Sequence, residues 1–275
     1  MQKQQKIVIL GDKGMLGQMA VRYFRERSFE VIEIPHRYEP ETHGAFMEAL
    51  REHAGAVVIN AIGRIKQKSE SARELIWANA LLPLDLADGL GSDQLLIQPS
   101  TDCVFSGKAG RPYNRSDHPD ASDDYGWSKR LGETALLSRN NTVIFRVSII
   151  GPEWGENPKG LLGWFLSQQP GSKLRGYVNH LWNGITTLEW CRQVEDYLAR
   201  HEKGSPCRIV QLGTAESYTK YEMLRLFQEI FGTDFEISEF ATEETVDKRL
   251  APDIVSKPLP EQLRNLLIEQ APPIA

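Results

Sequence analysis

The N-terminal segment, in which a short apolar run leads directly into three evenly spaced glycines, constrains the fold most. Residues 6–10 are rich in β-branched side chains and predict a strand; Gly11, Gly14 and Gly17 follow, and a helical apolar pattern comes next. Spaced glycines between a strand and a helix let the backbone approach a pyrophosphate, which then faces the free amides of the helix N-terminus. We therefore predict a dinucleotide-binding loop that includes Met15 and Leu16. Its Gly-x-x-Gly-x-x-Gly spacing differs from the Gly-x-Gly-x-x-Gly of most dehydrogenases, so the prediction depends on the preceding strand.

The alternation of strand and helix patterns continues through the first half of the chain. Strands are predicted at 29–34, 56–60, 94–98 and 142–147, with helical patterns between them, one of which runs over 69–90 and is broken only by Pro83. Such repeats imply an α/β fold, a Rossmann-type doubly wound parallel sheet with helices on both faces.

After residue 150 the pattern loosens, and then helices at 188–199, 218–231 and 260–268 and strands at 208–212 and 235–237 are predicted. We expect residues 1–150 plus about 186–214 to form the NADP-binding domain. The segments from about 151 to 185 and from 215 to 275 would form a smaller C-terminal α+β substrate-binding domain.

The ends of the predicted strands supply the other cofactor contacts. In such folds an acid at the end of the second strand holds the 2′-hydroxyl of NAD, whereas an arginine there accommodates the 2′-phosphate of NADP. Glu33 lies inside the strand pattern and Arg37 beyond its end, so NADPH is favoured; NADH and an ordinary surface arginine stay open as alternatives. Asn60, Ala61 and Ile62 follow the third strand and are expected to line the same site.

Tyr125 and Lys129 are the strongest candidates for chemistry. They are four residues apart in a helical pattern, so the phenol and the ammonium share one face. A phenol has an unperturbed pKa of about 10, and a neighbouring ammonium would lower it and make proton transfer easier. The plain alternative is an exposed aromatic and an exposed lysine. Hydroxyls follow the fourth strand at Ser100 and Thr101, where parallel sheets bind ligands.

The overall composition excludes several other classes of function. The net charge of −5 and the pI near 5.8 argue against a nucleic-acid or anionic-membrane partner. No apolar stretch is long enough for a membrane span or a signal peptide, so a cytoplasmic protein is expected. Cys103, Cys191 and Cys207 are not spaced as a disulfide framework or a zinc site, and the six histidines are scattered.

Because it has Ser100-Thr101, Tyr125 and Lys129 in this order, the chain resembles the extended short-chain dehydrogenase/reductase superfamily, and within it the dTDP-4-dehydrorhamnose reductase family. The matching segments come in the family's order and cover roughly the first 150 residues: 11–17, 58–61, 100–107, 125–133 and 145–148. The C-terminal part resembles the family less.

The resemblance implies an enzyme that uses NADPH to reduce a nucleotide-linked 4-keto-6-deoxy sugar. Hydride would reach sugar carbon 4, and Tyr125 would protonate the oxygen as Lys129 lowers its pKa and holds the nicotinamide ribose. Thr101 would hydrogen-bond that oxygen. The other substrate contacts implied are Ser100, Asp102, Ser148, Trp182 and Asn183, with core packing an open alternative for Trp182.

The chain also departs from the family's pattern. Some members carry a metal-bridging carboxylate two residues after the third glycine, where this chain has Met19, so no metal is expected there; a homodimer stays open. Where the family has an Asp-Gln-x-Gly-x-Pro-Thr motif, this chain has the segment 180–186, which matches it only in part. After Ser148, where the family usually has a tryptophan, this chain has Ile149. These changes leave open which nucleotide and which sugar the protein binds.

Two other functions stay open at this point. One is a non-catalytic NADP-binding regulatory or scaffold subunit, although Tyr125 and Lys129 are both retained. The other is a sugar-nucleotide epimerase or dehydratase of the same fold. Dehydratases typically place Asp-Glu directly after the threonine, whereas here Asp102 and Cys103 follow it, and a thiol is a poor carboxylate substitute.

Overall fold

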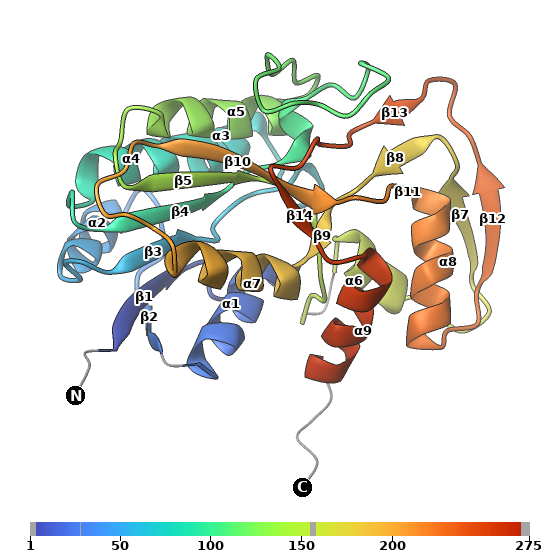
Figure 1. The fold of residues 1–275 in the computed structure, drawn as a ribbon, viewed down its shortest axis with the longest axis horizontal. Coiled ribbons are helices and arrows are strands. Elements are labelled where there is room, and N and C mark those ends of the chain that lie inside the picture. Colours follow the sequence, from blue (N-terminus) through green and yellow to red (C-terminus); the bar gives the residue numbers. More distant parts are fainter. Residues whose placement is uncertain (1–3, 28, 155–157, 271–275) are drawn as a thin grey trace, which may run out of the picture.

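The computed structural model describes residues 4–27, 29–154 and 158–270, and its centre is one seven-stranded sheet (Figure 1). The strand order is β14-β10-β5-β4-β3-β1-β2, and all neighbours are parallel. The predicted doubly wound parallel sheet is therefore confirmed. The strands are β1 (Gln5–Leu10), β2 (Phe29–Glu33), β3 (Val57–Asn60), β4 (Leu95–Pro99), β5 (Thr142–Arg146), β10 (Arg208–Thr214) and β14 (Ile254–Ser256).

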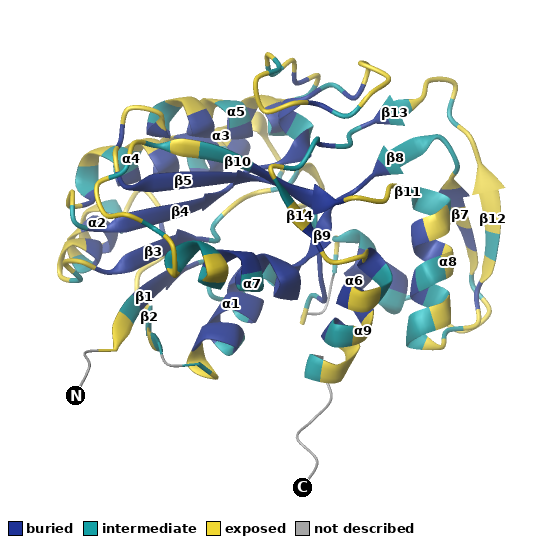
Figure 2. Ribbon diagram, in the orientation of Figure 1, coloured by how far each residue is buried: buried dark blue, intermediate teal, exposed yellow. Residues whose placement is uncertain are grey.

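Helices cover both faces of the sheet because successive strand residues point to opposite sides. In β1, Ile7 and Ile9 pack into the core that α1 (Met15–Arg25) and α7 (Thr187–Leu198) help to form. Val8 and Leu10 join the core on the other face, whose helices are α2 (His43–Arg51), α4 (Leu82–Gly89) and α5 (Asp124–Leu136). Figure 2 shows the resulting pattern, with buried strands in the middle and exposed outer helix surfaces.

The strand order places a topological switch point beside β1. The chain passes from β1 to β2 on one side and then returns to β3 on the other side of β1. In open α/β sheets, ligands bind outside the carboxyl ends of the strands at such a point. The segments there are the glycine loop after Leu10 and the residues that follow Asn60.

The long helical segment predicted at 69–90 is built from three consecutive helices. The helix α3 (Ala72–Ile76) runs into a π-helix (Trp77–Leu81), which runs into α4 with Pro83 in its first turn. A proline cannot donate the usual backbone hydrogen bond, and the wider π turn accommodates it without ending the helical course. The prediction was right about the helix and missed the π turn.

The remaining residues form a smaller lobe on the carboxyl side of the sheet (Figure 1). It contains several strands too short and mixed in composition for the sequence pattern to reveal. Its helices are α6 (Leu161–Leu166), α8 (Lys220–Phe231) and α9 (Leu259–Gln270), and its strands are β6 (Ile149–Ile150), β7 (Lys173–Tyr177), β8 (His180–Trp182), β9 (Ile185–Thr186), β11 (Tyr218–Thr219), β12 (Glu236–Phe240) and β13 (Val246–Asp247). The described ranges also contain two 3-10 turns, Lys66–Lys68 and Asp102–Val104.

Two differences from the prediction concern the C-terminal part. The helix expected from Tyr218 begins at Lys220, because Tyr218 and Thr219 pair with β8 as strand β11. The strand β14 extends the main sheet, although its residues fall in the segment assigned to the substrate lobe. The proposed division into two domains otherwise stays a prediction. None of the helices in the described ranges is long and apolar enough to cross a membrane.

Candidate active site at the carboxyl edge of the sheet

The glycine loop has the close backbone packing that a phosphate-binding turn requires. Gly11 has φ +78°, and a Cβ there would lie 2.9 Å from the amide nitrogen of Ile62. A Cβ on Gly17 would lie 2.0 Å from the carbonyl oxygen of Gly11, so α1 packs directly on the loop. Gly14 is the N-cap residue of α1, and within the described part of the chain no side chain caps that helix. The first-turn amides of Met15, Leu16 and Gly17 are therefore left for an anion.

The end of β3 is fixed against this loop. The Asn60 side chain is buried; its Nδ2 donates to Gln98 at 2.9 Å and its Oδ1 accepts from the Ile62 amide at 3.2 Å. The Ala61 amide donates to the Leu10 carbonyl at 2.9 Å. Asn60 thus shapes the turn that brings Ala61 and Ile62 beside Gly11. Direct contact of these three residues with a cofactor stays a prediction.

At the end of β2, the side chains of Glu33 and Arg37 differ in whether they have a charged partner. Glu33 forms an exposed ion pair with Arg25 at 3.0 Å. Arg37 is exposed in the following loop, and no carboxylate of the described residues pairs with its guanidinium. Arg37 is therefore available for a 2′-phosphate, while Glu33 is engaged.

The segment after β4 holds Thr101, one of the three residues expected at the reacting group. The Thr101 hydroxyl donates to the Asp102 carboxylate at 3.0 Å and accepts from the Cys103 amide at 3.1 Å, and both Thr101 and Asp102 are 6% exposed. The helix α5 lies against this segment, because a Cβ on Gly126 would be only 2.1 Å from the Cys103 carbonyl oxygen. Asp123 caps α5 by accepting from the Gly126 amide at 2.8 Å. The start of α5 is thereby fixed against the end of β4.

Tyr125 is half-buried in the first turn of α5, next to this segment. Burial raises the pKa of its phenol above the usual value, the Cys103 thiol adds to the rise, and the Thr101 hydroxyl, as its hydrogen-bond partner, opposes it. Lys129 is not among the groups with the largest effects on this pKa. The effect of burial is the largest, and a lowering of the Tyr125 pKa by Lys129 stays a prediction.

Lys129 lies one turn further along α5 and is 9% exposed. Its Nζ donates to the Pro99 carbonyl at 2.8 Å, at the very end of β4. Burial lowers the pKa of Lys129 to about 8, and the nearby Glu133 carboxylate works in the opposite direction. The ammonium is thus held at the end of β4 and is easier to deprotonate than an exposed lysine.

Ser100 belongs to a buried ionic network beneath the site. Its hydroxyl donates to Glu133 at 2.6 Å, and Glu133 accepts from Arg146 at 2.9 Å and 2.7 Å in a bidentate pair. Both charged side chains are 4% exposed. This network ties the end of β4 to α5 and β5. Substrate contact by Ser100 stays a prediction, and its hydroxyl is already engaged.

The other predicted substrate residues lie at the junction with the smaller lobe. Trp182 is 2% exposed, and its indole N–H has no acceptor among the described residues. The Asn183 amide nitrogen donates to the Leu250 and Thr214 carbonyls, and its oxygen accepts from the Leu250 amide. Ser148 is half-buried, and its carbonyl accepts from the Ile185 amide at 2.9 Å. Their contact with a substrate stays a prediction, and Asn183 already serves to join three segments.

Two residues at the site were not assigned from the sequence. Asn79, in the π-helix, is 2% exposed; its amide nitrogen donates to Ser128 at 3.0 Å and to the Arg64 carbonyl at 2.8 Å, and its oxygen accepts from the Arg64 amide. It therefore holds the loop after β3 to α5. The second is Lys220, whose ammonium lies 5.4 Å from the centroid of the Trp182 ring. Lys220 lies in an ordinary helical pattern, so nothing in the sequence points to it.

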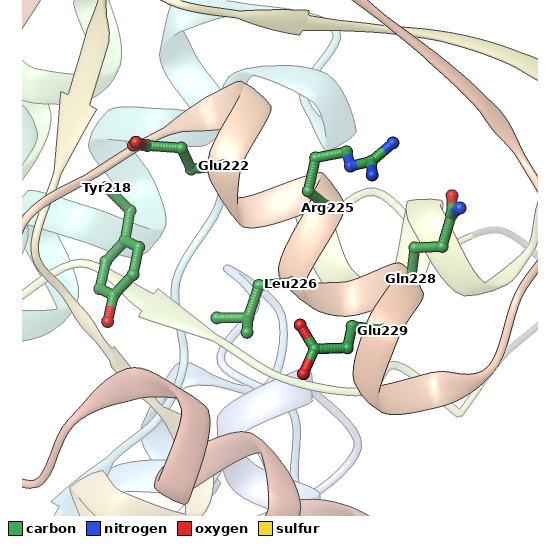
Figure 3. Close-up of a pocket in the computed structure, with 6 residues that line it drawn as sticks. All are labelled: Tyr218, Glu222, Arg225, Leu226, Gln228 and Glu229. Carbon is green, nitrogen blue, oxygen red and sulfur yellow. The ribbon is translucent and has the colours of Figure 1, made fainter.

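A separate hollow of about 470 Å³ lies along α8 (Figure 3). Its lining residues are Tyr218, Glu222, Arg225, Leu226, Gln228 and Glu229. None of the residues predicted to act on a substrate or cofactor lines it. Within the described ranges, no three or more histidine, cysteine or acidic side chains are grouped to hold a metal ion.

Comparison with known proteins identifies a family and several relatives that match part of the chain. Residues 5–173 match the family described as RmlD substrate binding domain. A probable dTDP-4,6-dihydroxy-2-methyloxan-3-one 4-ketoreductase of Streptomyces antibioticus is 37% identical over 155 residues, which cover 54% of this chain and 50% of that protein. A dTDP-4-dehydrorhamnose reductase of Streptomyces griseus is 37% identical over 135 residues, or 47% of this chain and 44% of that protein. The chain spans about half the length of these curated relatives.

Solved structures resemble the whole chain. A dTDP-4-dehydrorhamnose reductase of Bacillus anthracis in complex with NADP has a TM-score of 0.82 at 14% identity, covering 98% of this chain and 100% of that one. A dTDP-glucose 4,6-dehydratase of the same organism in complex with NAD has a TM-score of 0.75 at 14% identity, covering 96% of each chain. At these identities the likeness establishes the fold, which enzymes with different reactions share.

Proposed function

The chain belongs to the RmlD substrate binding domain family, and on this basis we propose that it is an NADPH-dependent reductase of a nucleotide-linked 4-keto-6-deoxy sugar. The observation that carries the proposal is the arrangement of Thr101, Tyr125 and Lys129 at the carboxyl ends of β4 and its neighbours, beside the glycine loop. Two relatives named as reductases of dTDP-linked keto sugars support it.

The residues at the switch point fit a dinucleotide. The cradle formed by Gly11 and Gly17 has no room for a Cβ, and the uncapped N-terminus of α1 offers amides and a positive dipole end to phosphates. Arg37 would bind a 2′-phosphate in a bidentate manner, which favours NADPH over NADH. NADPH, when bound, supplies the hydride.

The proton comes from Tyr125. A general acid must carry its proton at the working pH, and burial of the phenol keeps Tyr125 neutral. The Thr101 hydroxyl, next to the phenol, would turn from Asp102 to donate to the same substrate oxygen and position it. Lys129, still largely protonated near pH 7 with a pKa of about 8, would donate to cofactor hydroxyls from the end of β4 and assist the phenolate that remains after proton transfer.

A dehydratase reaction is less well supported by the same site. Elimination across sugar carbons 5 and 6 needs a base beside the sugar, and the residue at that place is Cys103. Burial raises the pKa of the Cys103 thiol to about 12, with the Asp102 carboxylate adding to the rise. A thiol that stays protonated at neutral pH cannot serve as that base.

The test uses the purified chain, NADPH and a panel of nucleotide-linked 4-keto-6-deoxy sugars, with NADPH oxidation followed by absorbance and the product identified by NMR. We expect one NADPH to be consumed per sugar. Tyr125→Phe should lower turnover by about 10²–10⁴-fold while NADPH binding, measured by calorimetry, is retained. Tyr197→Phe, on α7 at the opposite face of the sheet, is the matched control and should remain active.

Three outcomes would count against the proposal. Normal turnover in Tyr125→Phe would remove the proton donor from the mechanism. NADPH binding without reduction of any sugar would favour the scaffold function. Formation of a keto sugar from a nucleotide hexose that retains its 6-hydroxyl, with only catalytic amounts of cofactor, would favour a dehydratase.

A further inference from the structure

The loop at 34–42, between β2 and α2, is anchored by Tyr38, the residue directly after Arg37. Tyr38 is 6% exposed, whereas Arg37 is an exposed residue. The Tyr38 hydroxyl donates to the Asp85 carboxylate of α4, and its ring packs edge-to-face against Phe46 of α2, with the ring centroids 5.4 Å apart. The backbone beside Arg37 is therefore fixed to two helices on one face of the sheet.

Trp77, the first residue of the π-helix, holds the same part of the loop from a different element. Its indole N–H donates to the Tyr38 carbonyl at 3.1 Å. Its ring also stacks on the Tyr38 ring, with the centroids 5.1 Å apart and the planes at 30°. The carbonyl that follows Arg37 thus has a side-chain partner that is itself fixed by stacking.

Thr42 holds the carbonyl of Arg37 itself. Thr42 is the N-cap residue of α2, where a threonine hydroxyl usually accepts from an amide of the helix, but within the described residues its side chain caps no α2 amide. The hydroxyl instead donates to the Arg37 carbonyl at 2.5 Å, with the Glu39 carbonyl further away at 3.5 Å. The Glu39 amide donates to the Arg37 carbonyl as well, at 3.1 Å. The hydroxyl that could cap α2 is therefore used to fix the loop.

All these hydrogen bonds act on the backbone carbonyls of residues 37 and 38 and leave the Arg37 guanidinium free. An arginine that binds a phosphate through two parallel hydrogen bonds loses the rotamer freedom of a long side chain. If the loop also moved, the apparent affinity would fall in proportion to the fraction of molecules in which the loop is in place. Contacts that fix the loop beforehand therefore strengthen phosphate binding without touching the phosphate.

We propose that Trp77 and Thr42 are positioning residues that hold Arg37 for the 2′-phosphate and so set the preference for NADPH over NADH, an inference that rests on the proposed function. The two cofactors differ only in the 2′-phosphate. The ratio of their affinities therefore isolates the contact of Arg37 from those of the glycine loop and of the nicotinamide half, which both cofactors share.

The experiment measures the Kd of NADPH and of NADH by calorimetry for wild type and a set of matched variants. Thr42→Val removes the hydroxyl and keeps the shape of the side chain, whereas Thr42→Ser keeps the hydroxyl. Trp77→Phe removes the indole N–H and keeps a ring that can stack. Trp190→Phe is its control, because Trp190 lies in α7 on the opposite face of the sheet, and its indole N–H has no acceptor in the described ranges. Arg37→Ala tests the arginine itself.

We expect wild type to prefer NADPH by about 10–150-fold, as for a hydrogen bond to a charged group. Arg37→Ala should abolish this preference. Thr42→Val and Trp77→Phe should each lower it by about 2–12-fold, as for the loss of one neutral hydrogen bond, while the Kd of NADH stays nearly unchanged. Thr42→Ser and Trp190→Phe should keep the preference of wild type.

The possible failures of the inference and of the proposed function can be told apart. If Arg37→Ala abolishes the preference but Thr42→Val and Trp77→Phe keep it, or if these two variants lose both cofactors equally, the inference is wrong and the proposed function stands. If wild type shows no preference for NADPH, the role of Arg37 fails and the inference fails with it. If wild type prefers NADPH but reduces none of the sugars, the reductase function fails and the affinity ratios still decide the role of Trp77 and Thr42. Should Trp77→Phe not fold, the comparison of Thr42→Val with Thr42→Ser decides.

Discussion

Replacing Gly17 by alanine should destabilise the protein and weaken cofactor binding together. The added Cβ would lie 2.0 Å from the Gly11 carbonyl oxygen, whereas ordinary contact begins at 3.4 Å, so helix and loop must separate by more than 1 Å. Overpacking of this kind costs about 1–3 kcal/mol. Alanine recovers about 0.5–1 kcal/mol through its better helix propensity. We therefore expect a net loss of about 1–2 kcal/mol, or a fall in melting temperature of about 2–8 °C.

The assay is thermal unfolding with and without saturating NADPH. Ligand binding raises stability in proportion to the logarithm of concentration over Kd, so a distorted phosphate loop should show a smaller NADPH-induced shift. Two glycine variants serve as controls. A Cβ on Gly14 would meet nothing closer than 3.4 Å, and one on Gly44 in α2 would meet nothing within 4 Å. Gly14→Ala should change stability little and Gly44→Ala should raise it slightly. If Gly17→Ala matches Gly14→Ala in stability and Gly44→Ala in both readouts, the close packing of α1 on the loop does not support the site.

Three further predictions concern charged residues. Arg146→Met leaves the 4% exposed Glu133 carboxylate without its partner and should cost about 3–5 kcal/mol in the free energy of unfolding, measured by urea titration; an unchanged midpoint would contradict this. Because folding lowers the pKa of Lys129 to about 8, the unfolded chain binds more protons above that pH, and the stability that Lys129 contributes should rise with pH from about 8 to 10. The stability advantage of Lys129→Met over wild type should accordingly be largest near pH 7 and shrink by up to about 3 kcal/mol at pH 10, whereas a constant difference would mean an unshifted lysine. Arg37→Ala should weaken NADPH binding more than NADH binding in calorimetry, and equal wild-type affinity for both cofactors would identify Arg37 as a plain surface residue.

The parts of the fold that the sequence predicted are those with strong local signals. The strands of the N-terminal half are short continuous runs of apolar residues, because both faces of a covered parallel sheet are buried. Gly11 and Gly17 could be assigned because their spacing after a strand has a direct backbone cause. Tyr125 and Lys129 could be placed together because four residues along a helix return to one face.

The parts that the sequence did not predict depend on partners distant in the chain. Asn79 binds the loop at Arg64 and the α5 residue Ser128 at once, and an isolated asparagine in a helical pattern carries no sign of either. Strand β11 is two residues long and exists because it pairs with β8. The position of Lys220 follows from that pairing, so Lys220 could be recognised only once the smaller lobe was placed against the sheet.

The pKa of Tyr125 illustrates the limit of local reasoning about chemistry. Helical spacing correctly places Lys129 one turn from Tyr125, but a pKa depends on what surrounds each charged atom. The Lys129 ammonium is held by the Pro99 carbonyl and lies near Glu133, while the half-buried Tyr125 phenol lies near Cys103. The result is a neutral phenol beside a lysine that is itself easier to deprotonate. For a residue whose proposed task is to give a proton to a forming alkoxide, a phenol that stays protonated until the substrate oxygen becomes basic is the useful state. The raised pKa also makes the phenol a weaker acid, so only a strongly basic oxygen, such as the forming alkoxide, takes its proton readily.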